Sequence, residues 1–238
     1  MEKIIIFLLV SSFGFAQNLH VNYDATFNLS GILKQPIQQK VELIINQKQS
    51  LSKKYIIDRK ATKENMQEGR RLMTVGSDTL LYYKDYTTSK LYSEEKIFNK
   101  VFNVEDDLEL FDWQITNDTL SVLGYSCFKA TTKFRGREFE AYFAKDIPIS
   151  DGPMKFNGLP GLILKIKLIN SEGTFTAEAT KISNINSTST LTNPYSKFTD
   201  FENFKENYIQ KMNELTSYNT GKSGQIFASG FEILIVDE

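Results

Sequence analysis

Histidine and cysteine, on which most metal sites and many nucleophilic mechanisms depend, occur once each in this chain of 238 residues. A zinc site or a Ser-His-Asp triad needs histidine, and the single one, His20, lies close behind an amino-terminal apolar segment. With Cys127 alone the chain cannot form an internal disulfide, so the fold must be held by its core. We therefore expect neither a metal nor a cofactor.

Charge of one sign is not in excess either. There are 28 Lys and Arg residues against 29 Asp and Glu, giving a net charge of -1, which provides no field to steer nucleic acid or an anionic membrane surface. Nucleic acid is therefore not an expected partner. Tryptophan occurs once and proline five times, but 18 Phe and 11 Tyr residues are abundant. Aromatic residues favour strands, so this composition indicates a mainly β protein.

The apolar run at the amino terminus is too short to span a membrane. Residues 1–16 read MEKIIIFLLVSSFGFA, with Lys3 before the run and small residues at its end. A membrane-spanning helix needs about 20 apolar residues, whereas this pattern is typical of a signal peptide cleaved after Ala16. We expect an exported protein of the periplasm or cell surface that is not an integral membrane protein. Residues 17–238 are then one β-rich domain.

Alternating apolar and polar residues predict most of the strands. They run over 21–29, 40–46, 53–60, 125–134, 138–145, 162–169 and 174–182, with a hairpin at 72–83 and a last strand at 231–236. An acidic run at 105–109 should end a strand, and a turn at 117–118 should separate two more. Residues 183–197 are predicted to be a polar loop. Residues 200–215 are predicted to be a helix that begins with a capping box at Thr199.

These elements predict a mainly β, β-rich α+β fold. It should be a curved antiparallel sheet or open barrel, with one helix from the carboxyl-terminal region packed against it. Such a fold is similar to that of periplasmic lipoprotein-sorting proteins.

Residues 146–169 combine turn residues with large apolar ones. Pro160 and Gly161 suit the two central positions of a type II turn over 159–162. Phe156, Leu159 and their apolar neighbours cannot all face water, so the segment should fold back onto a core or line a cavity. We interpret it chiefly as an architectural corner between two strands, with any binding role secondary.

Five residues outside this segment are candidates for chemistry. Cys127 is expected to be a small buried side chain, although its neighbour Lys129 could lower its pKa. Glu138 and Glu140 project from one side of a strand, which could couple two carboxylates or simply form a solvated face. Lys165 and Lys167 also share a side. They could form a basic rim above an apolar concavity, suited to an anionic amphiphile or a peptide carboxylate, or stand on an ordinary exposed face.

Several blocks in order carry a resemblance to a known family. They are Trp113, GYSCFKA at 124–130, Gly136-Arg137, IPI at 147–149, Gly152-Pro153, Lys155-Phe156, and the motif residues Gly158, Leu159, Pro160, Gly161, Leu162 and Ile163. This pattern resembles the GLPGLI family of exported Bacteroidota proteins. The family pattern often has Trp in the strand before Ile147, where this chain has Tyr142-Phe143. The resemblance implies a location and a fold but brings no catalytic residues.

The function expected from these observations is that of a non-enzymatic binding or accessory protein of the cell envelope. Its partner would be a lipid, a peptide or an outer-membrane protein. One alternative is a carboxylate-based hydrolase that uses residues such as Glu138, Glu140 or Asp151. Another is a structural component of an envelope assembly.

Overall fold

The computed structural model describes residues 18–29, 35–57, 79–97, 100–169, 173–185 and 191–218. Its strands are β1 (Leu19–Leu29), β2 (Ile37–Ile45), β3 (Gln49–Ile56), β4 (Thr79–Asp85), β5 (Lys90–Ile97), β6 (Lys100–Asp107), β7 (Gln114–Val122), β8 (Tyr125–Phe134), β9 (Arg137–Ala144), β10 (Leu162–Ile169), β11 (Gly173–Asn184) and β12 (Thr199–Asp200). The helix α2 (Phe201–Tyr218) follows. The predicted fold class is confirmed.

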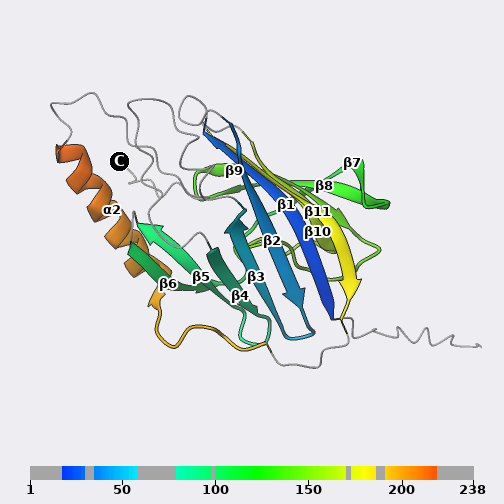
Figure 1. Ribbon diagram of the computed structural model, residues 1–238, viewed down its shortest axis with the longest axis horizontal. Coiled ribbons are helices and arrows are strands. Elements are labelled where there is room, and N and C mark those ends of the chain that lie inside the picture. The colour runs from blue at the N-terminus through cyan, green and yellow to red at the C-terminus, as the bar shows by residue number, and fades with distance from the viewer. Residues whose placement is uncertain are drawn as a thin grey trace, which may run out of the picture.

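All twelve strands belong to one open sheet, shown in Figure 1, in the order β12-β6-β5-β4-β3-β2-β1-β11-β10-β9-β8-β7. Every pair is antiparallel except β12 with β6, which is parallel. The sheet curves so strongly that the turn between β8 and β9 meets β6: Arg135 in that turn donates a hydrogen bond to Asp106 of β6 at 2.7 Å. Eight strands separate β6 from β8 in the sheet order.

One face of the sheet is largely apolar because apolar and polar residues alternate along its strands. On β1, Val21, Tyr23 and Ala25 are buried, and the register places them beside apolar residues of β2 and β11. We call this the inner face. Over β1, β2 and β8–β11 it carries the main core. Over β3–β5 it is mixed: the buried Tyr82 and Leu91 lie beside the buried polar residues Ser50, Ser52, Lys84 and Ser93.

The connection from β9 to β10, residues 145–161, crosses the inner face, and we call it the crossing segment. Met154 N donates to Ser52 Oγ of β3 at 2.9 Å, and Trp113 Nε1 donates to Asn157 O at 2.8 Å. The side chains of Ile147, Met154, Phe156 and Leu159 are buried. The segment therefore folds back onto the core, as predicted. It is also more than a corner, because it connects parts of the sheet that lie far apart in strand order.

Helix α2 is capped by Asp200 rather than by the predicted capping box. Asp200 Oδ1 accepts the Asn203 N–H at 2.8 Å, so Asp200 is the N-cap and the predicted role of Thr199 is wrong. Thr199 instead pairs with Val104 in β12. The helix packs on the sheet through Phe204, which forms a small second core with Val104 and Ile97.

Three further predictions of boundaries are corrected. β6 continues through the acidic run to Asp107, because Lys90 pairs with both Glu105 and Asp107 across the ladder. The predicted turn at 117–118 is a register shift inside the continuous strand β7. β11 extends to Asn184, and within the predicted loop Tyr195 Oη donates to Leu81 O at 3.0 Å.

Some predictions fall outside the described residues. They are the signal peptide at 1–16, the first arm of the hairpin at 72–78 and the strand at 231–236. Of the helices in the part of the chain that the structure describes, none is long and apolar enough to cross a membrane.

Candidate functional site

A buried charge network joins the crossing segment to β4. The ammonium group of Lys84 pairs with Asp151 Oδ1 and donates to Gly152 O at 2.8 Å and to Phe156 O at 2.9 Å. Asp151 Oδ1 also accepts the Gly152 N–H, and Asp151 Oδ2 accepts the Tyr86 hydroxyl. The three N–H donors of Lys84 are thus matched by three acceptors.

The ion pair at the centre of the network is sealed from solvent, whereas Tyr86 is half-buried. Both Lys84 and Asp151 have side chains with 0% exposed surface. Burial lowers the pKa of Lys84, and the adjacent Asp151 carboxylate opposes that shift. Burial likewise raises the pKa of Tyr86 well above its ordinary value, with the Asp151 charge adding to the effect. A group that exchanges protons with a substrate must be within reach of that substrate, and this buried ion pair is not. We therefore interpret the network of Lys84, Asp151 and Tyr86 as a structural link that holds the crossing segment in place, and we call it the clasp.

Glu138 and Glu140 stand on the outer face of β9 and are engaged in ion pairs. Glu140 lies between Lys129 at 2.8 Å and Lys167 at 3.3 Å, and these neighbours help to lower the pKa of Glu140 against the effect of burial. Glu138 pairs with Lys133 at 3.1 Å. Of the two alternatives given for these two carboxylates, the structure shows the charged outer face. Asp151 lies on the inner side, so the structure does not bring the three carboxylates of the hydrolase alternative together.

Lys165 and Lys167 do not form a basic rim above an apolar concavity. Lys165 pairs with Glu178 at 2.6 Å, and Lys167 pairs with Glu140. Both lysines project from β10 to the outer face, whereas the intervening Ile166 is buried on the inner face. The interpretation as a basic rim is corrected, because the apolar surface lies on the opposite side of the sheet.

Cys127 is buried, with 0% of its surface exposed, as the sequence predicted. Burial raises the pKa of its thiol, which is the reverse of what a reactive cysteine needs. Lys129, which could have lowered that pKa, instead pairs with Glu140.

The motif residues 158–163 form the end of the crossing segment and the start of β10. Leu159, Leu162 and Ile163 are buried, whereas Pro160 is exposed. Gly158 has φ +90°, which suits glycine. Gly161 has φ +159°, so the predicted type II turn is wrong. Glycine is required there because a Cβ would lie 2.3 Å from Ala144 O.

A second group of charged side chains occupies the inner face near the carboxyl-terminal ends of β3 and β5. Lys155 of the crossing segment pairs with Glu95 of β5 at 2.7 Å. Half-buried Lys54 of β3 has its pKa lowered to about 8, mainly by burial, although Glu95 opposes the shift. This group therefore adds a second electrostatic link between the crossing segment and the sheet.

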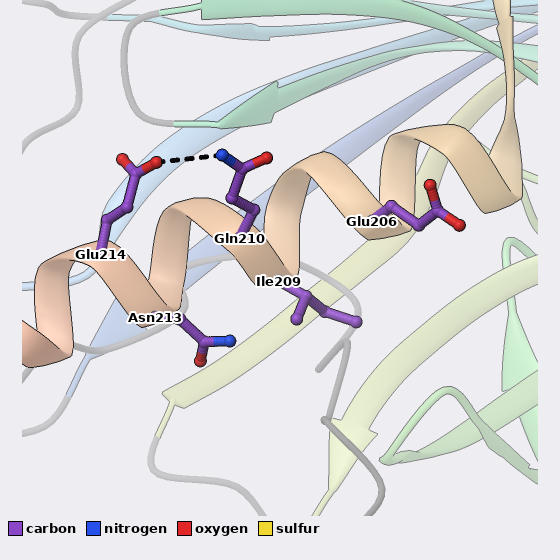
Figure 2. A pocket seen from close by; sticks show the side chains of 5 residues that line it. All are labelled: Glu206, Ile209, Gln210, Asn213 and Glu214. Carbon is purple, nitrogen blue, oxygen red and sulfur yellow. Dashed lines mark hydrogen bonds between the residues drawn. The ribbon is translucent and has the colours of Figure 1, made fainter.

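Two other features bear on whether the described residues could hold a ligand. A hollow beside α2 is lined by Glu206, Ile209, Gln210, Asn213 and Glu214, as Figure 2 shows. All five come from one helix, so no groups from different elements converge there. Among the described residues, no three His, Cys, Asp or Glu side chains lie close enough together to hold a metal ion.

The residues of the clasp could not be identified from the sequence. Lys84 follows Tyr82 at the inward position of a strand, and nothing local distinguishes it from a lysine that faces water. Its partner Asp151 is 67 residues away. The density of glycine and proline near Asp151 was the only local sign that this region is specialised.

Comparison with known proteins gives a family and a fold. Residues 31–206 match the family model described as N-glycanase peptide, N-terminal domain. No curated protein matches the sequence significantly. The fold is similar to that of PNGF-II in two crystal forms. One match has 18% identity and a TM-score of 0.51, and it covers 82% of this chain and 34% of that chain. The other has 17% identity and a TM-score of 0.50, and it covers 84% and 33%.

The chain thus spans about a third of the length of the PNGF-II chains that it matches. A LolA superfamily protein from Nitrosomonas europaea is 6% identical with a TM-score of 0.32, covering 72% of this chain and 88% of that chain. That likeness is too low to carry an argument about this protein.

Proposed function

The chain belongs to the family of the N-glycanase peptide, N-terminal domain, and from this membership we propose that it is an exported, non-enzymatic binding or accessory protein of the cell envelope. The ligand that we propose is a polypeptide. The resemblance to the GLPGLI family and the signal-peptide pattern at residues 1–16 support export.

The observation that carries the proposal is the extent of the family match. The family is described as one domain of an N-glycanase, and the similar part of PNGF-II is only about a third of that chain. A domain of this kind, taken alone, is suited to binding or positioning a partner rather than to the whole reaction. An N-glycanase acts on glycans attached to polypeptides, which makes a polypeptide the partner class of first choice.

The arrangement of charged residues supports the same proposal. The three carboxylates considered for hydrolysis are engaged, two in ion pairs on the outer face and Asp151 in the buried clasp. The inner face, where a lipid carrier would need an apolar space, is covered by the crossing segment with its buried Met154 and Phe156. A polypeptide that binds at the surface requires neither a catalytic cleft nor an interior cavity.

A direct test uses the full chain and three probes. The probes are a fluorescently labelled, unfolded N-glycoprotein, the same protein after removal of its glycans, and vesicles of phosphatidylethanolamine and phosphatidylglycerol. We expect saturable binding of both polypeptides by anisotropy, and no change in the mass of the glycoprotein.

Three outcomes would contradict the proposal in different ways. Release of the glycan by the chain alone would show an enzyme. Extraction of lipid from the vesicles without polypeptide binding would show a lipid carrier. Migration of the protein only as a large stable complex on size-exclusion chromatography, with no probe bound, would favour a structural component.

A further inference from the structure

The two edges of the sheet differ in how they are covered. At one end, β6 is paired with β12 and packed by α2, where Phe201 lies under the Arg135 guanidinium, 3.2 Å from ring centroid to Cζ. At the other end, β7 is the last strand, and among the described strands it pairs with β8 alone. Figure 1 shows β7 and α2 on opposite sides of the molecule.

β7 is exposed over almost its whole length. Of its nine residues, only Thr116 is half-buried and only Val122 is buried. The apolar side chains of Ile115 and Leu120, and of Leu123 just after the strand, are 48%, 36% and 45% exposed. Proteins usually block such an edge with lysine, proline or a β-bulge. β7 contains no lysine or proline, and its irregularity is confined to the part between Ile115 and Thr119. After its register shift the strand is regular from Thr119 to Val122.

The chain that leads into β7 and the strand itself are acidic, although the neighbouring strand β8 carries Lys129 and Lys133. Residues 101–128 contain six Asp and Glu residues and no Lys or Arg, although the whole chain is nearly neutral. Glu105, Asp106 and Asp107 are paired with Lys90 or Arg135. The acidic residues nearest β7 have less compensation from positive charge. Glu109 and Asp112 are exposed. Asp118 lies 3.9 Å from Lys129, but Lys129 is closer to Glu140.

We propose that the outer edge of β7 is a docking site for an extended basic peptide, which adds to the sheet as a further strand. Backbone N–H and C=O groups at a sheet edge supply the affinity in this binding mode, and the flanking side chains supply the selectivity. An apolar residue of the peptide contacts the exposed side chain of Leu120, and its lysine or arginine residues lie near Asp112 and Asp118. The inference rests on the proposed function and names the surface and the ligand class.

A second copy of this chain is a weaker occupant than a basic peptide. Two β7 edges brought together would place two acidic surfaces against each other. The regular part of β7, from Thr119 to Val122, is also short for the area that a stable dimer interface buries, which is roughly 1,200–2,000 Å².

The test compares one pair of matched variants and three peptides. Leu120→Lys places a blocking lysine on β7, and Val101→Lys places one on β6, at a residue with nearly the same exposure, 39% against 36%. The peptides are nine residues long: alternating Val and Lys, alternating Val and Glu, and the Val-Lys peptide with alternate backbone nitrogens methylated. Circular dichroism and thermal unfolding confirm that both variants fold.

We expect the wild-type chain and Val101→Lys to bind the Val-Lys peptide equally. Leu120→Lys should weaken binding by about tenfold or more, because one added charge both repels the peptide and blocks strand addition. The Glu peptide and the methylated peptide should bind far more weakly. Hydrogen exchange should slow at residues 114–123 when the Val-Lys peptide is bound, and added salt should weaken binding.

Each contrary outcome has a definite meaning. If the wild-type chain binds unfolded polypeptide but Leu120→Lys and Val101→Lys bind it equally, the β7 site is wrong and the proposed function stands. If neither the unfolded proteins nor the Val-Lys peptide binds the wild-type chain, both proposals fall. If the wild-type chain self-associates in ultracentrifugation and only Leu120→Lys abolishes this, the occupant is a second copy and the proposal of a basic peptide is overturned.

Discussion

Lys84 shows how a single charged residue can hold a long connection in place. Its ammonium group is fully buried and makes three contacts to the crossing segment, one of them to the Asp151 carboxylate. Removing one member of a buried pair leaves the other charge without compensation, which is more costly than losing the attraction itself.

We therefore predict that Lys84→Met lowers the free energy of unfolding by about 3–5 kcal/mol. Urea unfolding followed by Trp113 fluorescence measures this, since Trp113 donates to the crossing segment at Asn157. The double variant Lys84→Met/Asp151→Asn should lose less than the sum of the two single changes. As a control, Lys165→Met removes a partly exposed pair and should cost no more than about 1 kcal/mol. Equal effects of Lys84→Met and Lys165→Met would contradict the clasp.

The lowered pKa of Lys54 predicts that the stability of the folded protein depends on pH. Burial lowers the pKa of Lys54 to about 8 in the folded protein, below its ordinary value of 10.5. Between these two values the unfolded chain binds more protons than the folded chain, so stability rises with pH in this window. Below pH 8 both states are protonated at this site and the gain is absent.

The measurement is the thermal midpoint at pH 7 and at pH 9.5. We expect the wild-type protein to gain stability over this interval relative to Lys54→Met, which has no group to titrate at that position. Because Lys84 is retained in both proteins, its own lowered pKa cancels in the comparison. An identical change in the midpoints of both proteins would show that Lys54 is not buried as a charged group.

At the scale of elements, the crossing segment depends on a close approach between two backbones. The start of β10 passes the end of β9 so closely that a Cβ on Gly161 would meet Ala144 O at 2.3 Å and Ala144 C at 2.7 Å. Backbone atoms of a sheet cannot move aside as a flexible side chain can. The requirement for glycine is therefore chiefly this close approach, at a backbone φ of +159° that other residues rarely adopt.

We predict that Gly161→Ala abolishes the yield of soluble, folded protein or strongly lowers its thermal midpoint. The matched control is Gly124→Ala, at φ +83° with no heavy atom within 4 Å of the added Cβ. That change costs only the strain of a left-handed backbone, about 1 kcal/mol. A folded Gly161→Ala variant of wild-type stability would show that the two strands can separate at this point.

At the scale of the whole molecule, the open sheet is held in its curved form by contacts across its opening. Arg135, in the turn between β8 and β9, reaches Asp106 on β6 and the ring of Phe201 on α2. These contacts join regions that the strand order places far apart. The guanidinium combines a planar ion pair with stacking, which lysine cannot reproduce.

We predict that Arg135→Ala speeds hydrogen exchange in β6 and α2 and leaves exchange in β1 and β10 nearly unchanged. Local opening of one edge exposes those amides without unfolding the main core. Arg135→Lys should give an intermediate effect, because it keeps the charge and loses the stacking. A uniform rise in exchange across the sheet would indicate global destabilisation instead.

Local pattern was enough to predict much of this protein. Alternation predicted the strands from Tyr125 to Phe134 and from Leu162 to Ile169 with their observed boundaries, and the apolar spacing predicted one helix. These elements follow from the sequence because a strand face or a helix face is set by residues two to four positions apart. The charged outer face around Glu140 follows from the same periodicity. The burial of Cys127 was instead expected from its residue type, because Cys127 is out of phase with the buried Ala130 and Thr132 of β8.

Only the tertiary structure decided the rest. Lys84 and Asp151 are 67 residues apart, and whether a lysine in a strand faces water or a carboxylate depends on which segment crosses that face. Glycine at 161 was predicted for a turn, but it is needed because two backbones meet, and no local pattern records such an approach. The position of β7 at the end of the sheet formed by the described strands likewise depends on the order of those strands, which is set by long-range pairing.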